Sequence, residues 1–159
     1  MLYYIFLTAA MIAVDQIIKY WAVTALKSQS PINIIEGFFR LRYVENDGAA
    51  FSMLRGKQVF FVVITIAAFS VLVYMLKKRY ISGRLGYYAV AFITGGALGN
   101  FIDRVRLGYV VDMFDWCWIN FPVFNFADLC ITAGAILFIV MSYLDYKKET
   151  AEKKDNADA

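Results

Sequence analysis

Three stretches of the chain carry no charged residue, and they limit the possible fold more than any other feature of the sequence. They are Val59–Leu76, Leu85–Ile102 and Leu129–Leu144. A helix that crosses the hydrocarbon core of a bilayer needs about 20 largely apolar residues, and each stretch reaches that length once its uncharged or interfacial flanks are added. Hydrophobic residues make up 61% of the chain, whereas a soluble domain has about 45–50%. The three stretches therefore predict transmembrane helices.

A fourth transmembrane helix is predicted at the start of the chain. Leu2–Val14 is uncharged, and the apolar run continues to Leu26 with interruptions at Asp15 and Lys19. The alternative is a cleaved signal peptide, but such a peptide has a positively charged leader, and the residues directly after Met1 are uncharged. We therefore expect the helix to remain in the mature protein. The predicted fold class is an all-α membrane protein with four transmembrane helices.

Basic residues are distributed unevenly among the segments outside the expected helices. They are dense in the short link at 77–84 and in the tail after Leu144, and loops rich in Lys and Arg stay on the cytoplasmic side. Both termini are then cytoplasmic, and the longer loops at 27–58 and 103–125 face outward. We expect residues 1–146 to form one membrane domain and the polar tail at 147–159 to be disordered. No basic stripe indicates nucleic-acid binding.

The first outward loop contains the pattern of a β-strand. Apolar and charged residues alternate in Phe39–Tyr43, and Gly37 and the turn at Asn46–Gly48 flank this segment. Alternation with a period of two is typical of a strand with one apolar face. We expect a small extracytoplasmic β-sheet that lies on the membrane, and we interpret the loop at 37–58 as a lid or cradle for a substrate.

Polar residues in or beside the expected helices fall at one depth, near the outer surface. Polar residues placed at random along antiparallel helices would not share a level, and ionisable groups in membrane helices are costly and usually functional. The residues that reach this level, at a rise of about 1.5 Å per residue, are Asp15, Asn46, Asn100, Asp103, Asp112 and Asp128.

Several of these charges also have a purely structural interpretation. Asp15 and Lys19 are four residues apart and could neutralise each other on one helix face. Asp103 could be an ordinary interfacial charge, and Asp128 could be a carboxylate favoured by the positive end of a helix dipole. Asp115 is expected to be a solvated loop carboxylate. Sequence alone leaves these alternatives open.

The sequence contains no histidine, which restricts the catalysis available to it. Ser-His-Asp and Cys-His catalysis and HExxH zinc sites are excluded. Two carboxylates that share one proton can hydrolyse a peptide bond, because like charges about 3 Å apart cannot both ionise. Such a pair titrates as a unit, so the acid and the base are not assigned individually. A serine–lysine dyad is the other route without histidine, but no serine stands out beside a basic residue.

The two cysteines, Cys117 and Cys130, are not in a CxxC motif. We expect them to be apolar filling groups, with a disulfide between them left open.

Five short motifs occur in an order and spacing that resemble a known family. The motifs are Asp15-Gln16 with Lys19, Asn46-x-Gly48-Ala49-Ala50-Phe51, Gly99-Asn100-x-x-Asp103-Arg104, Val110-Val111-Asp112 and Phe124-Asn125-x-Ala127-Asp128. With these motifs the chain resembles bacterial lipoprotein signal peptidase, also called signal peptidase II, over nearly its whole length to about Tyr146. Asp47 and Ile18 stand where the family commonly has Thr, which affects loop details and leaves the aspartates unchanged.

The resemblance implies an aspartyl endopeptidase of the bacterial inner membrane that uses no metal or cofactor. It implies cleavage of a prolipoprotein signal peptide just before a cysteine that carries diacylglycerol, and inhibition by the cyclic peptide globomycin. The residues that it implies are the catalytic pair Asp112 and Asp128, the substrate-binding Asn46, Asn100, Arg104 and Asn125, and the supporting Asp15 and Asp103.

Two other classes of function remain possible from the sequence alone. A small proton-coupled transporter or channel would also use membrane acids, but it would place them near the midplane, whereas here they gather toward one face. A non-catalytic assembly subunit would tolerate the loss of either aspartate.

Overall fold

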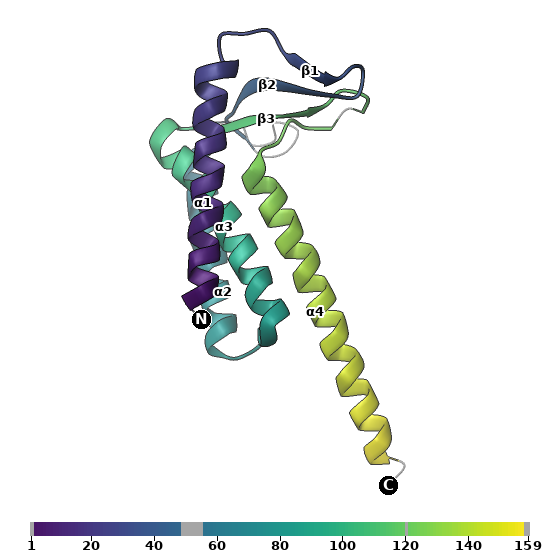
Figure 1. Ribbon diagram of the computed structural model, residues 1–159. Coiled ribbons are helices and arrows are strands. Elements are labelled where there is room, and N and C mark those ends of the chain that lie inside the picture. The colour runs from purple at the N-terminus through teal and green to yellow at the C-terminus, as the bar shows by residue number, and fades with distance from the viewer. Residues whose placement is uncertain (1, 49–55, 120, 158–159) are drawn as a thin grey trace.

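The computed structural model describes residues 2–48, 56–119 and 121–157, and within them it contains four long helices and a three-stranded sheet (Figure 1). The elements in chain order are α1 (Leu2–Trp21) with a π-helical turn η1 (Ala22–Leu26), β1 (Ile32–Ile35), β2 (Phe39–Asn46), α2 (Gln58–Lys77), α3 (Gly83–Leu107), β3 (Val110–Trp116) and α4 (Phe126–Ala157). This architecture confirms the predicted fold class.

Each of the four helices is long and apolar enough to cross a bilayer. Many of their large apolar side chains point away from the protein, and Val59 and Ile139, for example, are 77% and 66% exposed. A soluble protein rarely exposes so much contiguous apolar surface. The surface is that of a membrane protein, in which lipid chains cover these side chains.

Helix α3 packs against each of the other three helices, and glycines allow the closest of these contacts. A Cβ atom at Gly96 would overlap the carbonyl oxygen of Ala127, and one at Gly99 would overlap the carboxylate of Asp15. Small residues at helix interfaces let two backbones approach closely in a membrane. The glycines therefore bring α1 and α4 against α3 at the level where the predicted acids lie.

The sheet lies across one end of the helices, here called the sheet end (Figure 1). Its strand order is β1-β2-β3, and both neighbouring pairs are antiparallel. Gly108 ends α3 in a left-handed conformation with φ of +81°, as is common after a helix, and β3 begins two residues later. Val111 and Met113 of β3 then pack against Ala22 and Leu26 of η1. The sheet is thereby fixed to both α1 and α3.

The predicted strand at Phe39–Tyr43 is confirmed as part of β2, which continues to Asn46. The pairing of β2 with β3 is irregular between Leu41 and Val44, after which Asn46 lies opposite Val110. Residues 49–55, including Ala49, Ala50 and Phe51 of the second motif, lie outside the described residues. The interpretation of the loop at 37–58 as a lid or cradle therefore stays a prediction.

The predicted disorder of the tail at 147–159 differs from the structure, in which α4 continues to Ala157. The tail is rich in Ala, Glu and Lys, which are among the strongest helix formers. Helix α4 thus continues past its apolar part, although the side chains of residues 147–156 are exposed.

The interpretation of Asp115 as a solvated carboxylate is wrong. Asp115 is 4% exposed, and its Oδ2 lies 2.7 Å from the Nε atoms of both Arg40 and Arg42. Arg40 lies opposite Asp115 in the sheet, so strand pairing brings these charges together. Cys117 and Cys130 are free thiols, with Cys130 buried.

Candidate active site

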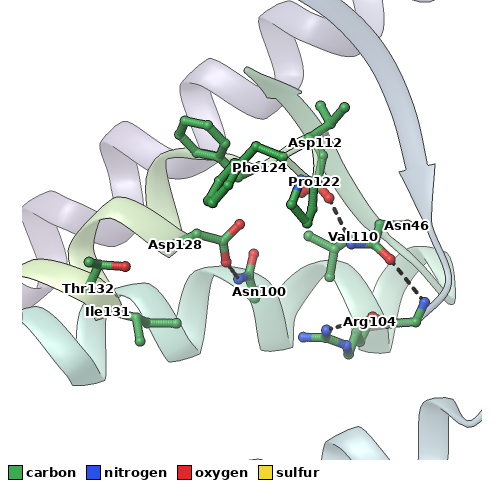
Figure 2. A pocket seen from close by; sticks show the side chains of 13 residues that line it. Asn46, Asn100, Arg104, Val110, Asp112, Pro122, Phe124, Asp128, Ile131 and Thr132 are labelled. Carbon is green, nitrogen blue, oxygen red and sulfur yellow. Dashed lines mark hydrogen bonds between the residues drawn. The ribbon is translucent and has the colours of Figure 1, made fainter. Parts of the chain in front are cut away.

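A pocket with a volume of about 290 Å³ opens at the sheet end, where β2, β3, α3 and α4 meet (Figure 2). We call it the carboxylate pocket, because carboxylates from two separate segments of the chain line it. Its polar lining consists of Asn46, Asn100, Arg104, Asp112, Asp128 and Thr132, and its other walls are Gly48, Val110, Ile131 and the segment 121–124.

Asp112 lies in the middle of β3 and is 1% exposed. Its Oδ2 accepts a hydrogen bond from Asn46 Nδ2 at 2.8 Å, and its Oδ1 accepts one from Asn125 Nδ2 at 2.6 Å. Burial raises the pKa of Asp112 to about 7, and the negative charge of Asp128 acts in the same direction. The two amide donors and the charge of Lys19 oppose this rise in pKa without cancelling it. Asp112 is therefore a carboxyl group that can hold a proton near neutral pH.

Asp128 lies in the first turn of α4 and forms a reciprocal cap with Asn125. Asn125 Oδ1 accepts a hydrogen bond from the backbone N–H of Asp128 at 3.0 Å, and Asp128 Oδ2 accepts one from the backbone N–H of Asn125 at 3.1 Å. This is the geometry of a capping box, in which the residue before the helix and the third residue satisfy each other's amides. The structural interpretation of Asp128 thus holds, and the same carboxylate also lines the carboxylate pocket.

Two asparagine amides join the carboxylates into one network. Asn125 Nδ2 donates to Asp112 Oδ1 and, at 3.0 Å, to Asn100 Oδ1. Asn100 Nδ2 donates to Asp128 Oδ1 at 2.8 Å, as Figure 2 shows. A continuous path of hydrogen bonds therefore runs from Asp112 through Asn125 and Asn100 to Asp128.

The side chains of Asp15 and Asp103 hold the backbone directly before each of the two pocket aspartates. Asp15 Oδ1 accepts a hydrogen bond from the N–H of Ala127 at 3.0 Å, and Asp103 Oδ2 accepts one from the N–H of Val111 at 3.0 Å. Both acids are almost fully buried, and both pair with Lys19, at 3.0 Å and 3.1 Å. Asp15 and Lys19 thus neutralise each other in part and also support the carboxylate pocket.

Arg104 lies on the other side of the carboxylate pocket and connects α3 to the loop after β2. Its Nη2 donates to the carbonyl oxygen of Gly48 at 3.4 Å, and its guanidinium lies over the ring of Phe61, 4.8 Å from the ring centre. A cation beside an aromatic face is attracted by the negative charge density of the ring. Arg104 therefore places a positive charge at the rim of the pocket.

The structure brings every predicted site residue to one place, although not all of them line the cavity. Asn125, Asp15 and Asp103 lie behind the lining residues and hold them. Gln16 was not predicted as a connecting residue, and its Nε2 donates to Asp15, to the carbonyl oxygen of Gly99 and to Asp103. Its position directly after Asp15 in a conspicuous motif was the available signal. The apolar walls at 121–124 carried no such signal, because apolar residues are common throughout the chain.

The fold and the pocket define a class: a membrane protein with four transmembrane helices and, at one end of the bundle, two carboxylates that are linked through asparagine amides. The family model described as signal peptidase (SPase) II matches residues 7–144, and the chain belongs to this family of membrane peptidases.

Curated relatives and solved structures agree with this assignment. The chain is 41% identical to the lipoprotein signal peptidase of Enterococcus faecalis, with 91% of the chain and 89% of the relative covered. It is 42% identical to that of Latilactobacillus sakei subsp. sakei, with 92% and 97% covered. A bacterial membrane enzyme solved by the in meso method at 2.3 Å resolution matches with a TM-score of 0.84 and 36% identity, over 91% of this chain and 90% of that one.

The reciprocal cap of α4 predicts a difference between two substitutions of Asn125. Asn125→Ser keeps an oxygen that can accept from the N–H of Asp128, whereas Asn125→Ala removes it, and both variants lose the amide donors. Replacing such a cap by Ala costs about 1 kcal/mol. We expect the Ala variant to be less stable than the Ser variant by about this amount, as measured by thermal unfolding in one detergent. Equal unfolding temperatures would contradict the cap.

Proposed function

We propose that the protein is an aspartic endopeptidase that removes the signal peptide from diacylglyceryl-modified prolipoproteins and cleaves just before the lipidated cysteine. The observation that carries the proposal is the pair Asp112 and Asp128, which line one pocket and are joined by the amides of Asn125 and Asn100. Membership of the signal peptidase II family and the names of the relatives support the substrate class.

The chemistry requires that the two aspartates share one proton. Burial and the charge of Asp128 raise the pKa of Asp112 to about 7, so Asp112 can carry the shared proton near neutral pH. Asp128 lies at the N-terminus of α4, where the helix dipole favours a negative charge. In the proposed reaction, Asp128 takes a proton from water while the water oxygen bonds to the peptide carbonyl carbon. Asp112 gives its proton to the carbonyl oxygen, and a gem-diol forms.

The second step restores both aspartates. Asp128 passes its proton to the peptide nitrogen as the carbon–nitrogen bond breaks, and Asp112 takes back a proton from the gem-diol as the new carboxyl group forms. The products are a peptide with a free carboxyl terminus and a lipidated cysteine with a free amino group. Two carboxylates can divide the acid and base roles in this way because their environments differ.

The remaining lining residues suit an extended peptide beside the aspartates. Asn46 and Asn100 present amide groups to the carboxylate pocket, and Arg104 adds a positive charge at its rim. Phe121, Val123 and Ile131 supply apolar walls. We propose that a substrate enters sideways from the bilayer, so that its apolar helix and acyl chains never leave the lipid, and that a cyclic peptide of the globomycin type competes for the same pocket.

We propose a topology in which both termini are cytoplasmic and the sheet end is at the outer surface of the inner membrane. The density of Lys and Arg at 77–84 and in the tail supports it. Cys117 is partly exposed at the sheet end, while Cys130 is buried. A membrane-impermeant maleimide added to intact cells should therefore label Cys117, with Cys117→Ser as the unlabelled control. If Cys117 is labelled only after the cells are broken, the sheet end faces the cytoplasm and the proposed topology is wrong.

Loss of either aspartate should abolish peptide cleavage. Asp112→Asn and Asp128→Asn each remove a carboxyl that must exchange protons, and we expect turnover of a diacylglyceryl prolipoprotein peptide to fall at least about 1,000-fold, since acid–base groups contribute about 10²–10⁴. Asp145→Asn, an exposed position on α4, is the matched control and should retain wild-type turnover. Normal cleavage by either pocket variant would refute the assignment, and would favour a transporter or an assembly subunit.

The raised pKa of Asp112 predicts how activity depends on pH. Above about pH 7, Asp112 loses its proton and can no longer protonate the carbonyl oxygen. We expect kcat/KM to fall about tenfold per pH unit on the alkaline side, with enzyme and substrate held in one detergent. A rate that stays constant from about pH 7 to 9 would show that no shared proton with this pKa is needed.

A further inference from the structure

The proposed mechanism does not use Lys19, although this residue is among the most buried charged groups of the protein, at 3% exposed. Its Nζ lies 3.0 Å from Asp15 Oδ2, 3.1 Å from Asp103 Oδ2 and 2.8 Å from Asn100 Oδ1. A lysine ammonium has three N–H donors, so these three oxygens occupy all of them. Lys19 on α1 is therefore joined to three side chains of two different helices.

Two of these contacts lead to the backbone beside each candidate catalytic residue. Asp15 accepts the N–H of Ala127, which directly precedes Asp128. Asp103 accepts the N–H of Val111, which directly precedes Asp112. A shift of the Lys19 ammonium would move both supporting carboxylates, and with them the two segments that carry the pair.

The third contact fixes the orientation of the Asn100 amide. Lys19 only donates hydrogen bonds, so the Asn100 oxygen must face it at 2.8 Å. The Asn100 nitrogen then faces Asp128, to which it donates at 2.8 Å. A reversed amide would set its NH₂ group against the ammonium and its oxygen against the carboxylate, and both contacts would be repulsive.

We propose that Lys19 is a positioning residue for the aspartate pair: its ammonium sets the separation of Asp112 and Asp128 through Asp15 and Asp103, and it orients Asn100 toward Asp128. The inference rests on the proposed function. If Lys19 only neutralised a buried acid, contact with one carboxylate would be enough, and any cationic side chain could replace it. The arrangement found here instead needs three donors that diverge from one small centre, which a planar guanidinium does not offer.

The first test is Lys19→Arg, which keeps the charge and changes the donor geometry. We expect the variant to fold with an unfolding temperature near that of the wild type, because both carboxylates keep a cation. Its kcat on a diacylglyceryl prolipoprotein peptide should fall at least about tenfold, since a 1 Å misplacement can cost about 10² in rate, while KM changes less than about threefold. The matched control is Lys27→Arg, because Lys27 is an exposed lysine that pairs with Glu45, and it should leave kcat unchanged.

The second test is Lys19→Met, which also removes the charge. The charged groups that face Asp112 are Asp128 on α4, Lys19 on α1 and, on α3, Arg104 and Asp103. The charge of Lys19 lowers the pKa of Asp112, so its removal should raise that pKa. The alkaline limb of the pH–rate profile should then move to higher pH in Lys19→Met and stay in place in Lys19→Arg. A role of Lys19 in folding alone would lower the folded fraction of both variants and leave kcat per folded molecule unchanged in Lys19→Arg.

Three outcomes would overturn the inference. The first is a folded Lys19→Arg variant with wild-type kcat. The second is a loss of kcat in both variants that only follows the fraction of folded protein. The third is failure of both variants to fold, because Lys19 would then be a structural residue. Failure of the proposed function would look different, since Asp112→Asn and Asp128→Asn would continue to cleave the peptide.

Discussion

The ion cluster of Lys19 with Asp15 and Asp103 is the interaction on which the rest of the structure depends. Charges are costly inside a membrane protein unless they are paired and hydrogen-bonded, and here each carboxylate also accepts a backbone N–H. The cluster joins α1 and α3 directly, and through these N–H groups it holds the first turn of α4 and the start of β3. Removing Lys19 would leave two buried carboxylates without a cation at the point where these elements meet.

Close helix packing is what makes this cluster possible. The carboxylate of Asp15 reaches the backbone of α4 only because Gly99 leaves room for it and Gly96 leaves room for the carbonyl of Ala127. The glycines of α3 therefore set the distances from α3 to α1 and α4, since larger side chains would push these helices apart and separate the site residues. The same contacts hold the membrane bundle together, so stability and site geometry depend on the same residues.

Sequence reasoning succeeded where a single physical rule decided the outcome. Charge-free segments predicted the spans, alternation predicted β2, and helix rise placed the acids at one level. It failed where tertiary contacts decided. Asp115 is buried because strand pairing brings Arg40 and Arg42 to it. The helical tail was missed because high charge indicated disorder, while strong helix propensity and continuity with α4 prevailed.

A hydrolase built into a bilayer must combine two opposing requirements, and the position of the carboxylate pocket meets both. Burial raises the pKa of Asp112 to about 7, yet hydrolysis consumes water, which the hydrocarbon core does not supply. The pocket lies at the sheet end, where the helices stop and β3 crosses them (Figure 1). On the proposed function and topology, water reaches the aspartates from the outer surface while a lipidated substrate arrives along the apolar helices. Moving the pair deeper would strengthen proton retention and cut off the water, so the end of the bundle is where this chemistry can operate.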